Sequence, residues 1–249
     1  MIKLELPPEP PELTAQKDRL TAEYREKKKA VWSVGAVGEI IKRVLCEMTH
    51  NKCAYSEAPL GENGNPWDVE HFYLKDLYPE KVVEWGNLLP SCKTCNTGKG
   101  KLDVEKTPIV NPLRDDPKDF LYVKGFRYRA CDQKGVGQRT IDVLRLNNLS
   151  QFVALRFKAA QYIVEALERV LRQADGTADY LLRGDVLQLM EEAGPSHPYS
   201  AVIATHLLYE DDGLAKLETL LRDRGAWDEH LAAAKQTLVS IALPAPHRK

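Results

Sequence analysis

Apolar residues recur with a helical period in both outer parts of the chain, and this pattern predicts a mostly helical protein. The spacing i, i+3, i+4 is clearest over residues 36–48, which predicts a helix with one buried face. A thinner apolar stripe predicts a helix over 13–31, after an extended proline-rich leader over 7–12 that cannot be helical. Toward the C-terminus the same period predicts helices over 152–172, 178–193, 199–223 and 227–242.

The middle of the chain replaces this period with short alternating segments. Residues 68–72 predict a short strand, and residues 87–90 predict a second segment that runs into a tight turn with Cys92 and Cys95. Residues 120–129 predict a hairpin. The expected fold class is therefore α+β, mostly helical, with a small mixed core between an N-terminal helical segment and a C-terminal helical region. We expect three parts, which are residues 1–50, 51–139 and 140–249.

Charge changes this picture only locally. The 249 residues carry 35 Lys and Arg against 36 Asp and Glu, so the net charge of −1 gives the whole chain no electrostatic attraction to nucleic acid. Between Lys118 and Arg139, six basic residues stand against two Asp, a local excess of four. This segment is either a surface that follows a phosphate backbone or a solvated loop face.

Cysteine usage indicates a reducing compartment. The count is odd, no export signal or membrane-spanning run is present, and two of the cysteines form a close Cys-x-x-Cys pair. We therefore expect a cytoplasmic protein without membrane contact, in which thiols bind metal rather than form disulfides. The five cysteines are Cys46, Cys53, Cys92, Cys95 and Cys131.

The candidate chemistry lies between residues 67 and 100. His71 has the properties of a general base, because its imidazole is neutral near pH 7 once a partner fixes its other nitrogen. Asn87 can hold the loop that carries this partner. Glu70 and Asn96 offer oxygen ligands, which suit Mg²⁺ or Mn²⁺. Together these residues predict metal-dependent hydrolysis of a phosphodiester.

This arrangement resembles the HNH endonucleases with a ββα-metal core, in the variant whose third motif residue is Asn. It is still more similar to the PtuB-like subfamily, the HNH component of the Septu anti-phage system. The resemblance implies that His71 is the general base, Asn87 the central structural residue, and Glu70 with Asn96 the ligands of a divalent catalytic metal. The matching segments are 6–13, 52–55, 69–72, 85–89, 111–117 and 144–147.

Members of this subfamily usually hold one zinc ion with two Cys-x-x-Cys knuckles. The first knuckle of this chain has a serine in place of its second thiol, since it reads Cys53-Ala54-Tyr55-Ser56. A neutral hydroxyl is a poor zinc ligand. Zinc on Cys53, Cys92 and Cys95, with Ser56, His50 or water as the fourth ligand, is favoured over a weak or lost site.

The resemblance implies a nuclease effector that cleaves DNA or RNA together with a PtuA-like ATPase of the ABC/AAA type. Two alternatives stay open. One is a non-catalytic, zinc-ribbon-like module that binds nucleic acid or protein, and the other is a standalone HNH nuclease of the restriction type. Lys75, Lys93, Lys99 and Lys101 are candidates for phosphate contacts or for an ordinary solvated surface.

Overall fold

The computed structural model describes residues 1–28, 35–61 and 66–246. Within these residues, helices predominate and two small two-stranded sheets are present, which confirms the mostly helical α+β class. The strands are β1 (Trp67–His71), β2 (Leu88–Cys92), β3 (Leu121–Lys124) and β4 (Arg127–Ala130). The helices are α1 (Pro11–Thr14), α2 (Lys17–Lys27), α3 (Ala36–Met48), α4 (Lys93–Lys99), α5 (Val136–Val143), α6 (Ala154–Gln173), α7 (Asp179–Glu192), α8 (Ser200–Thr205), α9 (Gly213–Asp223) and α10 (Glu229–Ile241).

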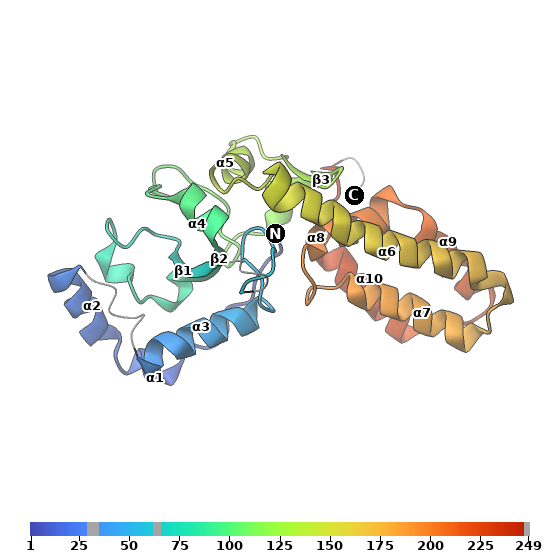
Figure 1. Ribbon diagram of the computed structural model, residues 1–249, viewed down its shortest axis with the longest axis horizontal. Helices are drawn as coiled ribbons and strands as arrows, with labels where there is room; N and C mark the ends of the chain where they lie inside the picture. The colour runs from blue at the N-terminus through green and yellow to red at the C-terminus, as the bar shows by residue number, and fades with distance from the viewer. Residues whose placement is uncertain (29–34, 62–65, 247–249) are drawn as a thin grey trace.

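The N-terminal helices form one end of the molecule, next to the β1–β2–α4 unit (Figure 1). The predicted helix over 36–48 is confirmed as α3, which buries Ile41 and Leu45 against a small cluster that includes Trp85 and Leu88. The helix predicted over 13–31 is divided into α1 and α2, and its last residues lie outside the described part of the chain.

The expectation that the leader cannot be helical is wrong at its end. Pro11 is the first residue of α1. A proline is tolerated there because the first helical N–H has no partner within the helix, and its fixed φ suits the first turn.

The sheet β1–β2 and helix α4 follow one another without a gap. β1 pairs antiparallel with β2, with His71 opposite Leu88 and Trp67 opposite Cys92. The tight turn predicted at the Cys-x-x-Cys is wrong, because α4 begins directly after Cys92. Gly98 permits this helix to pack closely, since a Cβ at this position would lie 2.4 Å from the carbonyl oxygen of Val143.

The predicted hairpin is confirmed as β3–β4. Its turn residues, Gly125 and Phe126, have φ values of 55° and 63°. Both are in the left-handed region, as a two-residue hairpin turn with the twist of its strands requires. A glycine supplies the first of these positions at little steric cost.

The C-terminal helices form the other end of the molecule (Figure 1). The single helix predicted over 199–223 is wrong: α8 passes into a π-helical turn at His206–Glu210, and α9 begins only at Gly213. The Asp211 side chain accepts a hydrogen bond from the Gly213 N–H at 2.6 Å, which provides a local alternative to continued helix.

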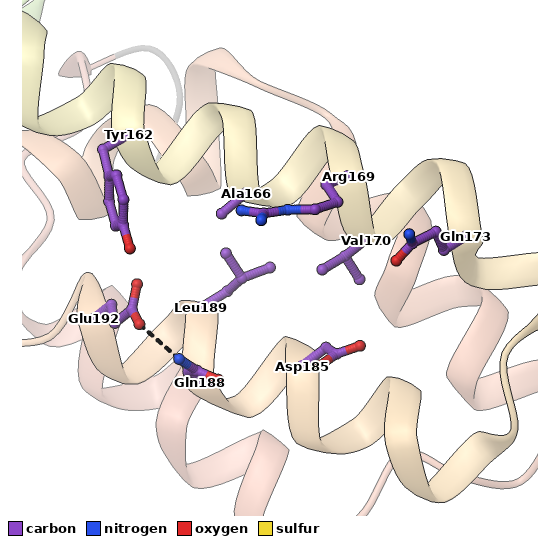
Figure 2. A pocket seen from close by; sticks show the side chains of 9 residues that line it. All are labelled: Tyr162, Ala166, Arg169, Val170, Gln173, Asp185, Gln188, Leu189 and Glu192. Atoms are coloured by element: carbon purple, nitrogen blue, oxygen red, sulfur yellow. Dashed lines mark hydrogen bonds between the residues drawn. The ribbon is translucent and has the colours of Figure 1, made fainter.

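A groove of about 320 Å³ lies between α6 and α7. Figure 2 shows that basic and acidic side chains, such as Arg169, Asp185 and Glu192, line it together with Tyr162. The buried apolar residues of α6 and α7 belong to the same core as Cys92 and Tyr128. The division at residues 50 and 139 stays a prediction.

Glu57 is a buried carboxylate that joins separate parts of this core. It accepts hydrogen bonds from the hydroxyls of Ser200, at 2.7 Å, and Tyr128, at 3.2 Å, and it contacts the Met1 amine. Burial raises the pKa of Glu57, but the charges of the Met1 amine and Lys52, with these hydrogen bonds, outweigh burial and lower the pKa to about 2.

Glu57→Gln should therefore lower the free energy of unfolding by about 3 kcal/mol at pH 7, because it leaves buried donors and cations poorly compensated. The folded pKa lies below the ordinary value of 4.5, so this contribution is present above pH 4.5 and is lost as the pH falls toward 2. Urea denaturation at pH 7 and pH 3 measures the difference. Glu39→Gln, at a side chain that is 77 % exposed, is the control. An equal Glu57→Gln effect at both pH values would contradict the assignment.

Candidate functional site

Two polar pairs dock α4 onto β1. Asp68 and Glu70 share a face of β1 because they are two residues apart, and Asn96 and Lys99 share a face of α4. Asn96 Nδ2 donates to Asp68 Oδ2 at 2.7 Å, and Lys99 Nζ lies 2.5 Å from Glu70 Oε1. The acid–histidine segment and the Cys-x-x-Cys-Asn segment therefore lie side by side.

His71 ends β1 and is 5 % exposed. Its Nε2 lies 2.9 Å from the carbonyl oxygen of Val82. A carbonyl can only accept, so Nε2 carries the proton and the neutral ring presents a lone pair at Nδ1. Burial, with the charge of Lys75, lowers the pKa of His71 to about 3 against the opposing effect of the Val82 hydrogen bond. The imidazole is consequently neutral near pH 7.

Asn87 is 1 % exposed and binds backbone groups on the loop between β1 and β2. Its Oδ1 accepts from the Tyr73 N–H at 2.7 Å, and its Nδ2 donates to the carbonyl oxygens of Tyr73, at 3.1 Å, and Lys81, at 2.8 Å. Because Lys81 precedes Val82, Asn87 also sets the position of the carbonyl that orients His71.

The environments of Glu70 and Asn96 differ from each other. Glu70 is 7 % exposed, and burial raises the pKa of its carboxyl although Lys99 opposes this shift. The hydrogen bond described for the Asn96 side chain uses Nδ2. Its Oδ1 can therefore serve as a hydrogen-bond acceptor or metal ligand for another partner. Carboxylate and amide oxygens are ligand types of hard divalent cations, but Lys99 already contacts Glu70 Oε1.

Asp68 is not among the site residues expected from the sequence, and Lys99 is expected there only as a phosphate contact or part of a solvated surface. The Lys99 side chain is 1 % exposed and also donates to the His71 carbonyl oxygen at 2.8 Å, so it belongs to the interior of the site. Alternation along the strand was the available signal, since Asp68 occupies the same face as Glu70. Burial alone would raise the pKa of the Asp68 carboxyl. Hydrogen bonds from Lys93 and Asn96 outweigh this effect and lower the pKa.

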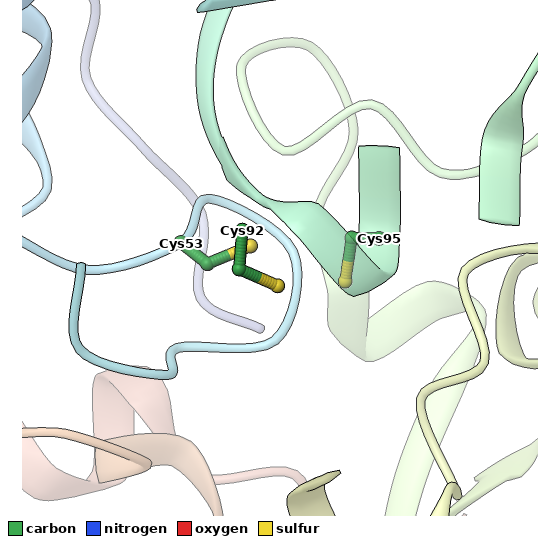
Figure 3. Close-up of side chains that lie close together, drawn as sticks. All are labelled: Cys53, Cys92 and Cys95. Atoms are coloured by element: carbon green, nitrogen blue, oxygen red, sulfur yellow. The ribbon is translucent and has the colours of Figure 1, made fainter. Parts of the chain in front are cut away.

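Cys53, Cys92 and Cys95 lie close together where β2 leads into α4 (Figure 3), with their sulfur atoms within 4.8 Å of one another. All three residues are buried, and the cluster could hold a metal ion such as zinc. Ser56 is fully buried beside it, with Oγ 3.7 Å from Cys92 Sγ. His50, the other predicted fourth ligand, is exposed and is not part of this cluster.

The basic segment 118–139 is partly committed to structure. Lys118 Nζ donates to the Val239 carbonyl oxygen at 2.9 Å, and Arg139 Nε donates to the Pro108 carbonyl oxygen at 3.1 Å. These two residues bind helix α10 and the loop at Pro108, so the local excess of charge overstates the surface available to a phosphate backbone.

The protein is a mostly helical α+β protein. Its two-stranded sheet β1–β2 and helix α4 form a ββα unit, and the thiol cluster at their junction could hold a metal. The chain belongs to the PtuB family of Septu proteins. It is 36 % identical over 240 residues to the Septu protein PtuB of Bacillus thuringiensis, with 92 % of this chain and 91 % of the relative covered. A Septu protein PtuB of Bacillus mycoides is 23 % identical, over 66 % of this chain and 72 % of the relative. No protein-family model matches the chain.

The described helices include none with the length and apolar character needed to cross a membrane.

Replacing Ser56 with cysteine should complete a four-thiolate set. We expect Ser56→Cys to raise zinc affinity more than about tenfold, or about 1.4 kcal/mol, because thiolate is a far better zinc ligand than hydroxyl. Competition with a chromogenic chelator measures the change. Cys46→Ser, at a half-buried cysteine outside the cluster, is the control. Unchanged affinity in Ser56→Cys would show that Ser56 does not occupy a ligand position.

Proposed function

We propose that this protein is a metal-dependent HNH nuclease that hydrolyses phosphodiester bonds in DNA or RNA, as an effector of anti-phage defence in the bacterial cytoplasm. The observation that carries the proposal is the fixed imidazole of His71, oriented by Val82 beside the buried Glu70. A protein that only binds nucleic acid has no chemical need for this arrangement.

In the proposed reaction, His71 removes a proton from the attacking water. Its Nε2–H is committed to the Val82 carbonyl, so the proton is accepted at Nδ1. With a pKa of about 3, the isolated site is a weak base. The negative charge of a bound phosphodiester raises the pKa of an adjacent imidazole, which brings His71 closer to the range of an effective base.

Glu70 and Asn96 Oδ1 are the residues that would hold Mg²⁺ or Mn²⁺, as the donor set fits these ions. A bound divalent cation would supply stabilisation of charge on the phosphate and on the leaving oxygen. Lys99 neutralises Glu70 and ties α4 to the His71 backbone, so the chain itself keeps these groups in register. Asp68 orients the Asn96 amide through Nδ2.

The burial of His71 and Glu70 supports control by a partner. At 5 % and 7 % exposure, both side chains offer little surface to a polymer, and movement of the surrounding residues would increase it. A nuclease that is closed when alone can be opened by an assembly that recognises infection. We propose that this partner is a PtuA-like ATPase of the ABC/AAA type.

His71→Ala should lower cleavage by about 10²- to 10⁴-fold, because a positioned general base contributes about that much. The measurement is cleavage of plasmid DNA and of transfer RNA by the protein purified with its partner, with Mg²⁺ or with EDTA. Circular dichroism and co-purification with the partner should be unchanged. Equal activity of the variant would refute the mechanism, and full activity of the wild type without a partner would support a standalone nuclease.

Asp68→Ala should weaken Mn²⁺ binding about 10- to 100-fold, because groups that orient metal ligands typically contribute this much to affinity. Asp68→Asn retains an oxygen that can accept from Asn96 and should restore most of the affinity. Electron paramagnetic resonance of Mn²⁺ in the His71→Ala background reports binding without turnover. Lys93→Ala removes the other partner of Asp68 and is the matched control. Equal affinities of Asp68→Ala and wild type would exclude the positioning role.

A further inference from the structure

Two aromatic rings and one cation lie on the loop that follows His71, and a second cation reaches them from a separate loop. We define the Tyr73 cluster as Tyr73, Tyr78, Lys81 and Arg114. Lys81 Nζ lies 3.6 Å from the centroid of the Tyr73 ring, and Arg114 Nη1 donates to the Tyr73 hydroxyl at 3.0 Å. The rings of Tyr73 and Tyr78 meet edge to face at 5.6 Å.

The described residues place no carboxylate closer than 3.9 Å to the two cations, although the Tyr78 hydroxyl donates to Asp103 Oδ1 at 2.7 Å. The contacts described for the Arg114 side chain are with the Tyr73 ring and hydroxyl rather than with a carboxylate. The nearest carboxylate to Lys81 belongs to Glu105, at 3.9 Å on a side chain that is 54 % exposed. Lys81 is half-buried and Arg114 is exposed, so both cations can be reached from solvent.

The cluster is also rigidly connected to the candidate site. Asn87 binds the N–H and carbonyl of Tyr73 and the carbonyl of Lys81. The residue after Lys81 supplies the carbonyl that orients His71. The backbone at Arg114 is held separately, by its N–H donating to the Asn111 carbonyl oxygen at 3.0 Å. Two independent loops thus present cations at fixed positions.

We propose that the Tyr73 cluster binds backbone phosphates of the nucleic-acid strand next to the bond that is cut. This inference rests on the proposed nuclease function and assigns it a strand-binding subsite. Two residues of extended chain span at most about 7 Å, so Tyr73 lies within that distance of His71 along the backbone. Phosphates of one strand recur about every 3.4 Å along a B-form axis, so neighbours of the scissile phosphate are within reach.

Packing against tyrosine suits cations for this role. The ring and hydroxyl restrict Lys81 and Arg114 without neutralising them, so less side-chain entropy is lost when a phosphate binds. Contacts of this kind position a strand and carry no sequence information. Sequence-independent binding is therefore expected.

The test measures how the full-length His71→Ala protein binds labelled 20-nucleotide DNA and RNA oligonucleotides in EDTA. Fluorescence anisotropy at several salt concentrations reports the affinity. Adding Lys81→Gln or Arg114→Gln should each weaken affinity about 3- to 10-fold and reduce the salt slope by about 1. Lys216→Gln makes the same charge change on α9, at a side chain that is 64 % exposed, and should change neither quantity.

Tyr73→Phe separates cation positioning from fold. It keeps the ring under Lys81 and removes the hydroxyl that holds Arg114, so it should weaken binding less than Arg114→Gln with little change in salt slope. If Lys81→Gln and Arg114→Gln match Lys216→Gln, or if the parent binds neither oligonucleotide, the proposal is wrong. Because binding is measured without cleavage, these outcomes are independent of the test of His71. If the protein cleaves nucleic acid but the cluster variants bind normally, only the subsite is refuted. If the protein binds nucleic acid but never cleaves it, only the nuclease function is refuted.

Discussion

One buried amide determines the arrangement around the candidate site. Asn87 satisfies three backbone groups from residues 73 and 81, and each such group would cost about 1–3 kcal/mol if it were left buried without a partner. The carbonyl of Val82 follows directly in the chain and orients His71. The position of the imidazole and the position of the Tyr73 cluster therefore depend on the same side chain, although Asn87 itself carries no chemistry.

Helix α4 connects the thiol cluster to the residues that we propose are catalytic. Its first turn carries Cys95 and follows Cys92, so the thiol cluster fixes where the helix starts. Asn96, the residue after Cys95, and Lys99, one turn further on, contact β1. A short helix gains little stability from its own hydrogen bonds, so these contacts at both ends determine its direction. Loss of order at the thiols would be transmitted to Asn96 through less than one turn of helix.

The sequence was sufficient where local chemistry decides the structure. The period of α3 and the Gly125 turn set those elements with little help from the rest of the fold. It was insufficient where tertiary contacts decide, as for α4, whose register on β1 depends on pairs between residues that are 28 and 29 positions apart. Asp68 illustrates this limit: an acid in an alternating strand gives no sign of its partner, and only the docked helix shows that it binds Asn96. Ser56 could be found in the knuckle motif, whereas excluding His50 required its exposed position in space.

The contrast between a closed site and an open cluster suggests an order of events. His71 is nearly inaccessible, whereas Arg114 is exposed and Lys81 is half-buried on the same loop system. A strand can therefore meet the cations first, through contacts that do not distinguish one sequence from another. In the proposed mechanism, movement of the loop that Asn87 secures would then expose His71, and a partner would act at this second step. Separate binding and opening steps would let a near-neutral protein associate with nucleic acid without cutting it until its partner acts.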